Sequence, residues 1–117
     1  MPGRRILVLL TLLAGTATAA AIAPAATSTS AAKITVTATD FKFKFSTTRV
    51  VHGKHTFTLV NRGQATHDFK IAGKKTRLLS TGQRAAITVT LKKGRYPYLC
   101  TVPGHKQLGM KGTLVVR

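Results

Sequence analysis

Hydrophobic and polar residues alternate along much of the chain after residue 32. In the first such segment, Ile34, Val36 and Ala38 alternate with threonines. Because successive side chains of a β-strand point to opposite faces, this pattern predicts a strand with one buried face. The same period of two recurs further along the chain. The four clearest segments are 33–39, 41–45, 56–59 and 87–91.

Turn-forming residues separate these predicted strands. The turn signals are His52-Gly53-Lys54, Asn61-Arg62-Gly63, Ala72-Gly73, Lys92-Lys93-Gly94 and Pro103-Gly104. No segment beyond the N-terminal region has a helical period, and residues 73–84 are expected to form a long connection. Short strands at this spacing predict an all-β fold, a Greek-key antiparallel β-sandwich or barrel of about 7–8 strands.

The first 32 residues differ from the rest of the chain. Residues 1–23 have the features of a signal peptide: Arg4 and Arg5, an apolar run over 6–14, and small residues at 17–19. We expect this segment to be cleaved; if retained, it would tether the protein to a membrane. Residues 24–32 form a predicted disordered linker, and 33–117 form one domain. The protein is therefore expected to be periplasmic, extracellular or on the outer face of the cytoplasmic membrane.

The charge of the chain is strongly unbalanced. Its 117 residues include 19 Lys and Arg but two acids, Asp40 and Asp68, which gives a formal net charge of +17. Such a charge predicts attraction to an acidic partner or an anionic surface, with a solubilising coat as the alternative. The basic residues are spread along the chain and the protein is predicted to be exported, so we expect no nucleic-acid partner.

Candidate metal ligands lie close together near the C-terminus. Cys100, His105 and Met110 fall within eleven residues, and Cys100 is the only cysteine. A single cysteine in an exported chain indicates a free thiol, an intermolecular disulfide or a metal ligand. A thiolate, an imidazole and a thioether in one loop form most of the ligand set of a blue copper site. Such a site needs a second histidine, and His67 is the candidate.

The predicted strands direct both His67 and Cys100 inward. His67 shares one strand face with Phe69 and Ile71, and Cys100 shares a face with two tyrosines. The 33 residues between His67 and Cys100 permit their strands to be neighbours in a Greek key. A sharp turn at 103–104 would then bring the rest of the loop back to the same point.

The sequence of this loop resembles that of a known family. The segment YLCTVPGH at 98–105, followed by GMKG at 109–112, is similar to the C-terminal copper loop of the cupredoxins. These are the small blue copper proteins of the plastocyanin and azurin type, and the resemblance covers about 33–117. It implies a cupredoxin fold and one type 1 copper ion. His67, Cys100 and His105 would lie in the ligand plane, and Met110 would be the axial ligand.

The resemblance also implies a contact between the two ligand segments. Similar proteins usually have asparagine after the first histidine and serine or threonine after the cysteine. Here these positions hold Asp68 and Thr101. We expect Asp68 to accept a hydrogen bond from the Thr101 hydroxyl and to place a negative charge near the copper.

The function implied is that of a monomeric one-electron carrier for redox proteins with acidic docking surfaces. Storage or delivery of copper in the cell envelope is the alternative, and a metal-free sandwich is a third. An enzyme is not expected, because a multicopper oxidase needs further domains and a binuclear purple copper site needs two cysteines. His52 and His55 flank a predicted solvated turn and receive no role.

Overall fold

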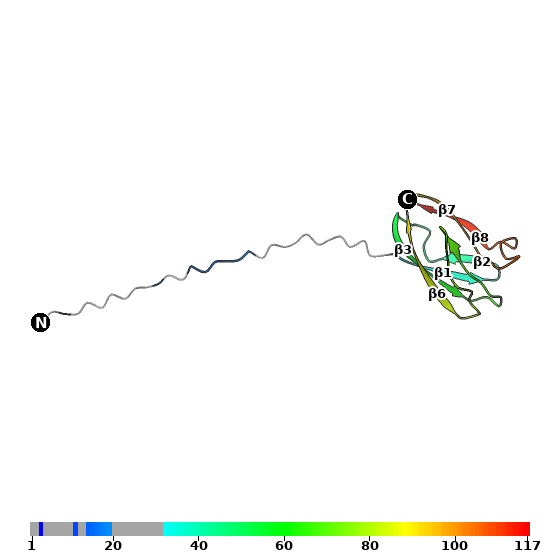
Figure 1. Cartoon of the computed structure of the whole chain (residues 1–117), viewed down its shortest axis with the longest axis horizontal. Coiled ribbons are helices and arrows are strands. Elements are labelled where there is room, and N and C mark those ends of the chain that lie inside the picture. Colours follow the sequence, from blue (N-terminus) through cyan, green and yellow to red (C-terminus); the bar gives the residue numbers. More distant parts are fainter. Residues whose placement is uncertain (1–2, 4–10, 12–13, 20–31) are drawn as a thin grey trace.

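The computed structural model describes residue 3, residue 11, residues 14–19 and residues 32–117. The predicted signal peptide and linker lie mostly outside these residues. Within the described residues the chain forms eight strands and no helix, which confirms the all-β prediction (Figure 1). The strands are β1 (Ala32–Thr39), β2 (Lys42–Phe45), β3 (Gly53–Asn61), β4 (Lys70–Ile71), β5 (Lys74–Lys75), β6 (Arg84–Leu91), β7 (Gly94–Leu99) and β8 (Lys111–Val116).

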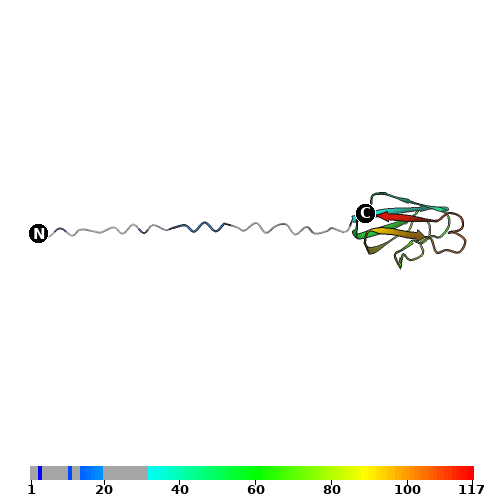
Figure 2. The same cartoon turned by 90° about the horizontal axis from the view of Figure 1, so that it is seen from above.

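The strands form two four-stranded sheets. One has the order β2-β1-β3-β6 and the other the order β5-β4-β7-β8. Figure 2 shows strands of the two sheets running along the domain in layers. Sequence neighbours such as β3 and β4 lie in different sheets, so the chain crosses between the layers. This arrangement is the predicted β-sandwich.

One strand pair is parallel. β1 pairs with β3 in the parallel sense, whereas β2, the partner of β1 on its other side, runs antiparallel. The hairpin to β2 returns the chain to the end where β1 began, so that β3 starts at that same end. As a result β1 and β3 both finish at the opposite end of the sandwich, where Asp40 and the loop after Asn61 lie.

The alternating residues predicted to be internal form the core. In β1, for example, Ile34, Val36 and Ala38 are buried between the sheets. The phenylalanines at 41, 43 and 45 are half-buried and pack against the cluster. The buried cluster consists of Ile34, Val36, Ala38, Val50, Phe57, Leu59, Phe69, Ile71, Leu79, Val89, Leu91, Cys100, Met110, Leu114 and Val116.

The predicted turn at 52–54 is wrong, because β3 already begins at Gly53. His55 is buried, not solvated, since alternation along β3 places it on the same face as Phe57. Its Nε2 lies 2.5 Å from the Val51 carbonyl oxygen. The long connection after residue 73 contains the two-residue strand β5 before it becomes irregular.

The C-terminus and the candidate ligand loop lie at opposite ends of the domain. β8 begins beside Leu99 and runs to the other end, where the amide of His52 donates to the Arg117 carbonyl. The loop after β7 projects at the far end from the C-terminus (Figure 2). Among the described residues, no helix has the length and apolar character needed to cross a membrane.

Candidate metal centre

Sheet pairing brings the candidate ligands to one end of the sandwich. β4 and β7 are antiparallel with Lys70 opposite Leu99, so His67, before β4, lies near Cys100, after β7. β8 starts opposite the same Leu99, which places Met110 beside Cys100. The amide of Cys100 donates to the Met110 carbonyl at 3.0 Å. The ladder registers therefore position three of the four candidate ligands.

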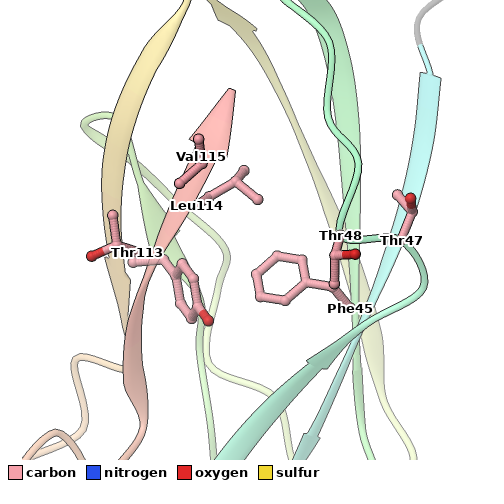
Figure 3. Close-up of a pocket in the computed structure, with 7 residues that line it drawn as sticks. Phe45, Thr47, Thr48, Thr113, Leu114 and Val115 are labelled. Carbon is pink, nitrogen blue, oxygen red and sulfur yellow. The ribbon is translucent and has the colours of Figure 1, made fainter. Parts of the chain in front are cut away.

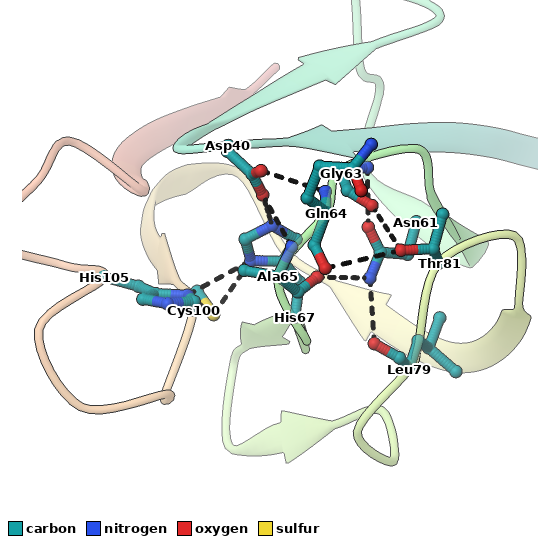
Figure 4. Close-up of polar contacts among 10 residues, drawn as sticks. All are labelled: Asp40, Asn61, Gly63, Gln64, Ala65, His67, Leu79, Thr81, Cys100 and His105. Carbon is teal, nitrogen blue, oxygen red and sulfur yellow. Dashed lines mark hydrogen bonds and ion pairs between the residues drawn. The ribbon is translucent and has the colours of Figure 1, made fainter.

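Three donor atoms converge at this end. The Nδ1 atoms of His67 and His105 are 3.1 Å apart, and the Cys100 Sγ lies 4.0 Å and 3.6 Å from them (Figure 4). One ion at bond lengths of roughly 2.0–2.3 Å, as for zinc with nitrogen and sulfur, can contact all three. These residues form the metal-ligating cluster detected in the described part of the chain. Two imidazoles and a thiolate fit a copper ion.

Met110 is fully buried in the same loop. Its amide donates to the carbonyl of His105 at 3.1 Å, so the loop closes on itself between these two residues. Thus all four predicted ligands lie on segments that meet at one end of the sandwich. Besides the Cys100 thiolate, the loop contains a second soft sulfur donor, the Met110 thioether.

The imidazole of His67 is fixed from its far side. Its Nε2 lies 2.7 Å from Oδ1 of Asp40, and the ring is fully buried. A proton on Nε2 satisfies this carboxylate and leaves the Nδ1 lone pair facing Cys100 and His105. The contact with Asp40 therefore selects the tautomer that a metal ligand requires.

Asp68 ties the two ligand segments together. It is fully buried, and its Oδ1 accepts from the amide of Thr101 at 2.6 Å. Its Oδ2 accepts from the Thr101 hydroxyl, the hydrogen bond expected from the sequence. The residues following His67 and Cys100 thus hold the two segments side by side.

Burial also controls protonation of the ligands. Desolvation raises the pKa of the Cys100 thiol, although the amides of Asp68 and Val102 oppose this by donating to the sulfur. Desolvation lowers the pKa of His105, and the neighbouring His67 lowers it further. A metal ion must therefore displace a proton from Cys100, whereas His105 is disposed to be a neutral ligand near neutral pH.

The two histidines differ in exposure. His67 is fully buried, whereas His105 is half-buried in the projecting loop. Two leucines of this region are exposed: Leu108, in the loop of His105, and Leu78, which lines a hollow with Val102 and Pro103. We call the side chains of Leu78, Val102, Pro103 and Leu108 the apolar patch. Leu78 was not predicted to belong to it, because it comes from the unpatterned connection.

Two further residues at the site were not predicted. Asp40 supports His67, and Phe41 packs edge-on against His67 and His105, with centroid distances of 6.2 Å and 5.0 Å. Alternation identified Phe41 only as a core residue. One signal could have identified Asp40, namely the rarity of acids: both acidic residues of the chain contact the candidate site.

A separate hollow of about 190 Å³ lies at the seam between β2 and β8. The ring of Phe45 faces Leu114 and Val115 across it (Figure 3). Its lining contains threonines and Tyr98 but none of the candidate ligands. The hollow therefore takes no part in the candidate metal centre.

Comparisons with known proteins agree with this fold. Auracyanin-B of Chloroflexus aurantiacus is 48% identical over 42 residues, which span 35% of this chain and 18% of that relative. Reduced auracyanin from Roseiflexus castenholzii has a TM-score of 0.62 at 20% identity, covering 75% of this chain and 99% of that one. Auracyanin A of Chloroflexus aurantiacus, a "blue" copper protein, gives 0.62 at 22%, covering 75% and 100%.

The family comparison covers nearly the whole chain. The sequence profile described as "Cupredoxin-like domain" matches residues 6–116. The match includes both ligand segments and all eight strands. The chain belongs to the cupredoxin-like domain family.

Proposed function

We propose that this protein is a type 1 copper protein that carries single electrons between redox partners. The observation that carries the proposal is the convergence of His67 Nδ1, Cys100 Sγ and His105 Nδ1 within 4.8 Å of one another. Together with the thioether of Met110, these residues would supply the donor set of a blue copper site.

Copper supplies the one-electron chemistry when bound, because it is stable as Cu(I) with soft sulfur and as Cu(II) with imidazole. The protein holds its donors in place independently of the metal. Asp40 fixes the ring of His67, and Asp68 joins the two ligand segments through Thr101. A donor set held in this way changes little between oxidation states, and a small structural change favours rapid electron transfer.

Electrons would enter and leave through His105. Its ring is the less buried of the two imidazoles, and Val102 and Leu108 of the apolar patch are hydrogen-bonded to its backbone. Such a patch permits brief contact with a partner over a small interface. Lys106 and Lys111, both exposed, lie close to the same loop and would favour an acidic partner.

We further propose that the protein acts outside the cytoplasm, as a monomer and as a carrier rather than an enzyme. The support for export is the arginine pair and apolar run within residues 1–23. Copper delivery is less well supported, because His67, Cys100 and Met110 are all buried, whereas delivery requires ligands that a recipient can reach.

The test is the visible spectrum of the purified protein after addition of Cu(II). We expect an intense thiolate-to-copper charge-transfer band in the wild type and its loss in Cys100→Ser, because the thiolate is the electron donor of that transition. His52→Ala is the matched control, since His52 is exposed and its ring contacts the Arg117 carbonyl, at the end of the domain opposite the ligand loop. A wild type without the band, or a Cys100→Ser variant that retains it, would refute the proposal.

A further inference from the structure

The acidic residues of this chain are placed in an unusual way. Nineteen basic residues are spread over the sequence, but the two acids, Asp40 and Asp68, both contact ligand segments. Asp68 directly follows His67 in the sequence, whereas Asp40 lies 27 residues from its partner His67. In so basic a chain, a carboxylate could pair with many exposed Lys or Arg side chains, yet Asp40 contacts the buried imidazole of His67.

The carboxylate of Asp40 is held by the loop after β3. Its Oδ2 accepts from the amide of Gln64 at 2.9 Å, and its Oδ1 accepts from the amide of Ala65 at 3.1 Å (Figure 4). The first of these amide hydrogen bonds is the main reason that the pKa of Asp40 is lowered. The side chain is 27% exposed, so it sits at the rim of the site with one edge towards His67.

The loop itself is organised by buried side chains. Asn61 is fully buried and donates to the carbonyls of Ala65 and Leu79 at 2.9 Å and 2.8 Å. Its own oxygen accepts from the amide of Gly63 at 2.8 Å, and the hydroxyl of Thr81 donates to the Gly63 carbonyl at 2.6 Å. The amides that bind Asp40 are therefore fixed in position.

Gly63 provides the space for the contact. A Cβ atom at this position would collide with Oδ1 of Asp40 and would lie 2.9 Å from Nε2 of His67. The absence of a side chain thus allows the carboxylate and the imidazole to meet at 2.7 Å. A substitution at Gly63 can disturb this contact without removing any charged group.

We propose that Asp40 is a positioning residue that increases the electron-donor strength of His67 and thereby stabilises Cu(II) relative to Cu(I). The inference rests on the proposed function, since it concerns the potential of the same centre. A carboxylate that accepts the Nε2 proton makes the imidazole a more basic ligand at Nδ1. The more basic ligand favours the more highly charged ion, so the reduction potential is lowered. The carboxylate also prevents the ring from turning away.

The principal test compares the reduction potentials of the copper-loaded wild type and Asp40→Asn. Loss of such a supporting contact typically costs roughly 10–100-fold in metal affinity. If the loss falls mainly on Cu(II), the Cu(II)/Cu(I) affinity ratio falls by that factor, and the potential rises by about 59 mV for each factor of ten. Titration of Asp40→Asn with each copper oxidation state and a competing chelator should show that the affinity falls mainly for Cu(II).

Gly63→Ala tests the contact without a change of charge. The added methyl group should displace the carboxylate from His67 and raise the potential in the same direction as Asp40→Asn. Gln107→Lys is the charge control for Asp40→Asn, because both substitutions make the net charge more positive by one. Gln107 is exposed in the ligand loop, so this variant leaves the contact between Asp40 and His67 intact. Its effect should be smaller and should disappear in high salt, because exposed charges are screened.

A copper-free measurement complements the potentials. In the metal-free wild type, NMR of the His67 ring should show the proton on Nε2, slow to exchange, and Asp40→Ala should make it exchange rapidly. The inference is overturned if Asp40→Asn leaves the potential unchanged, or if its shift matches that of Gln107→Lys and vanishes in salt. It is likewise overturned if the wild-type proton lies on Nδ1. A wild type that shows no blue band instead refutes the proposed function, whereas the NMR result still reports on the Asp40 contact.

Discussion

Each predicted ligand is held by hydrogen bonds that do not involve a metal. Asp40 orients His67, Asp68 fixes the segment after Cys100 through Thr101, and the carbonyl of Met110 accepts from the Cys100 amide. A histidine ligand with a carboxylate partner keeps its tautomer and its orientation. The centre is therefore largely preformed, and individual side chains can be replaced to change its properties with little change to the fold.

Met110 is the residue that should set the potential most directly. Met110→Leu removes the axial sulfur and should raise the potential, because Cu(II) loses a donor, whereas Met110→Gln supplies a harder oxygen donor and should lower it. We expect a change in the Cu(II)/Cu(I) affinity ratio of roughly tenfold, or about 59 mV, measured by redox titration of the blue band. Equal potentials in the wild type and both variants would identify Met110 as a core residue only.

At the scale of elements, the ligand loop is supported by the pairing of β7 with β8, the two strands that it connects. Tyr98 on β7 lies directly opposite Gly112 on β8, and its ring covers the glycine so closely that a Cβ there would collide with it. The same ring packs against Phe45 and Phe69, with centroid distances of 4.8 Å and 5.8 Å. An aromatic side chain that covers a cross-strand glycine stabilises the register of the pair.

Gly112→Ala should therefore destabilise the domain. The added methyl group must displace the ring of Tyr98, and we expect the free energy of unfolding, from urea denaturation of the metal-free protein, to fall by about 1–3 kcal/mol. The double variant Gly112→Ala with Tyr98→Ala is the control. If the ring is the obstacle, the two losses are not additive, because the second substitution removes the collision. Additive losses would show that Gly112 is required for another reason.

At the scale of the whole molecule, exposed charges and exposed apolar side chains lie close together at the ligand loop, where Lys106 and Leu108 are both exposed. Leu108 of the apolar patch lies in the loop of the half-buried His105, while exposed lysines and arginines occur on every strand. Salt screens exposed charges beyond about 8 Å at physiological ionic strength, but it does not weaken apolar contact in the same way. The two kinds of surface should therefore affect electron exchange differently.

Electron exchange with an acidic cytochrome, measured by stopped flow, should slow as ionic strength rises, and exchange with a basic one should accelerate. Lys106→Glu should reduce the rate with the acidic cytochrome mainly at low salt, because it weakens attraction before contact. Leu108→Asp should reduce it at every salt concentration, because Leu108 is 61% exposed in the apolar patch and the change places a charge in the contact. If the rate of electron exchange changes neither with ionic strength nor in Lys106→Glu, the basic surface has a solubilising role only.

Features that depend on local pattern could be predicted from the sequence alone. The period of two predicted the internal faces of β1, β3 and β6 and the inward direction of His67, because alternation is a property of each strand alone. The rarity of cysteine and methionine, with their spacing from His105, identified the candidate ligands and the family. The turn prediction at 52–54 failed because a glycine, although typical of turns, can also begin a strand, as Gly53 does.

Features that join distant segments of the chain depend instead on how the two sheets pack together. The parallel pairing of β1 with β3 brings Asp40 to the loop that follows Asn61, and the crossing to the other sheet brings His67 to both. Leu78 likewise reaches the apolar patch from an unpatterned connection. The alternation within a strand does not indicate which strands will pair, because pairing depends on burying the inner faces of both sheets against each other. Hence the candidate ligands could be predicted from the sequence, whereas the pairing of the Asp40 carboxylate with His67 could not.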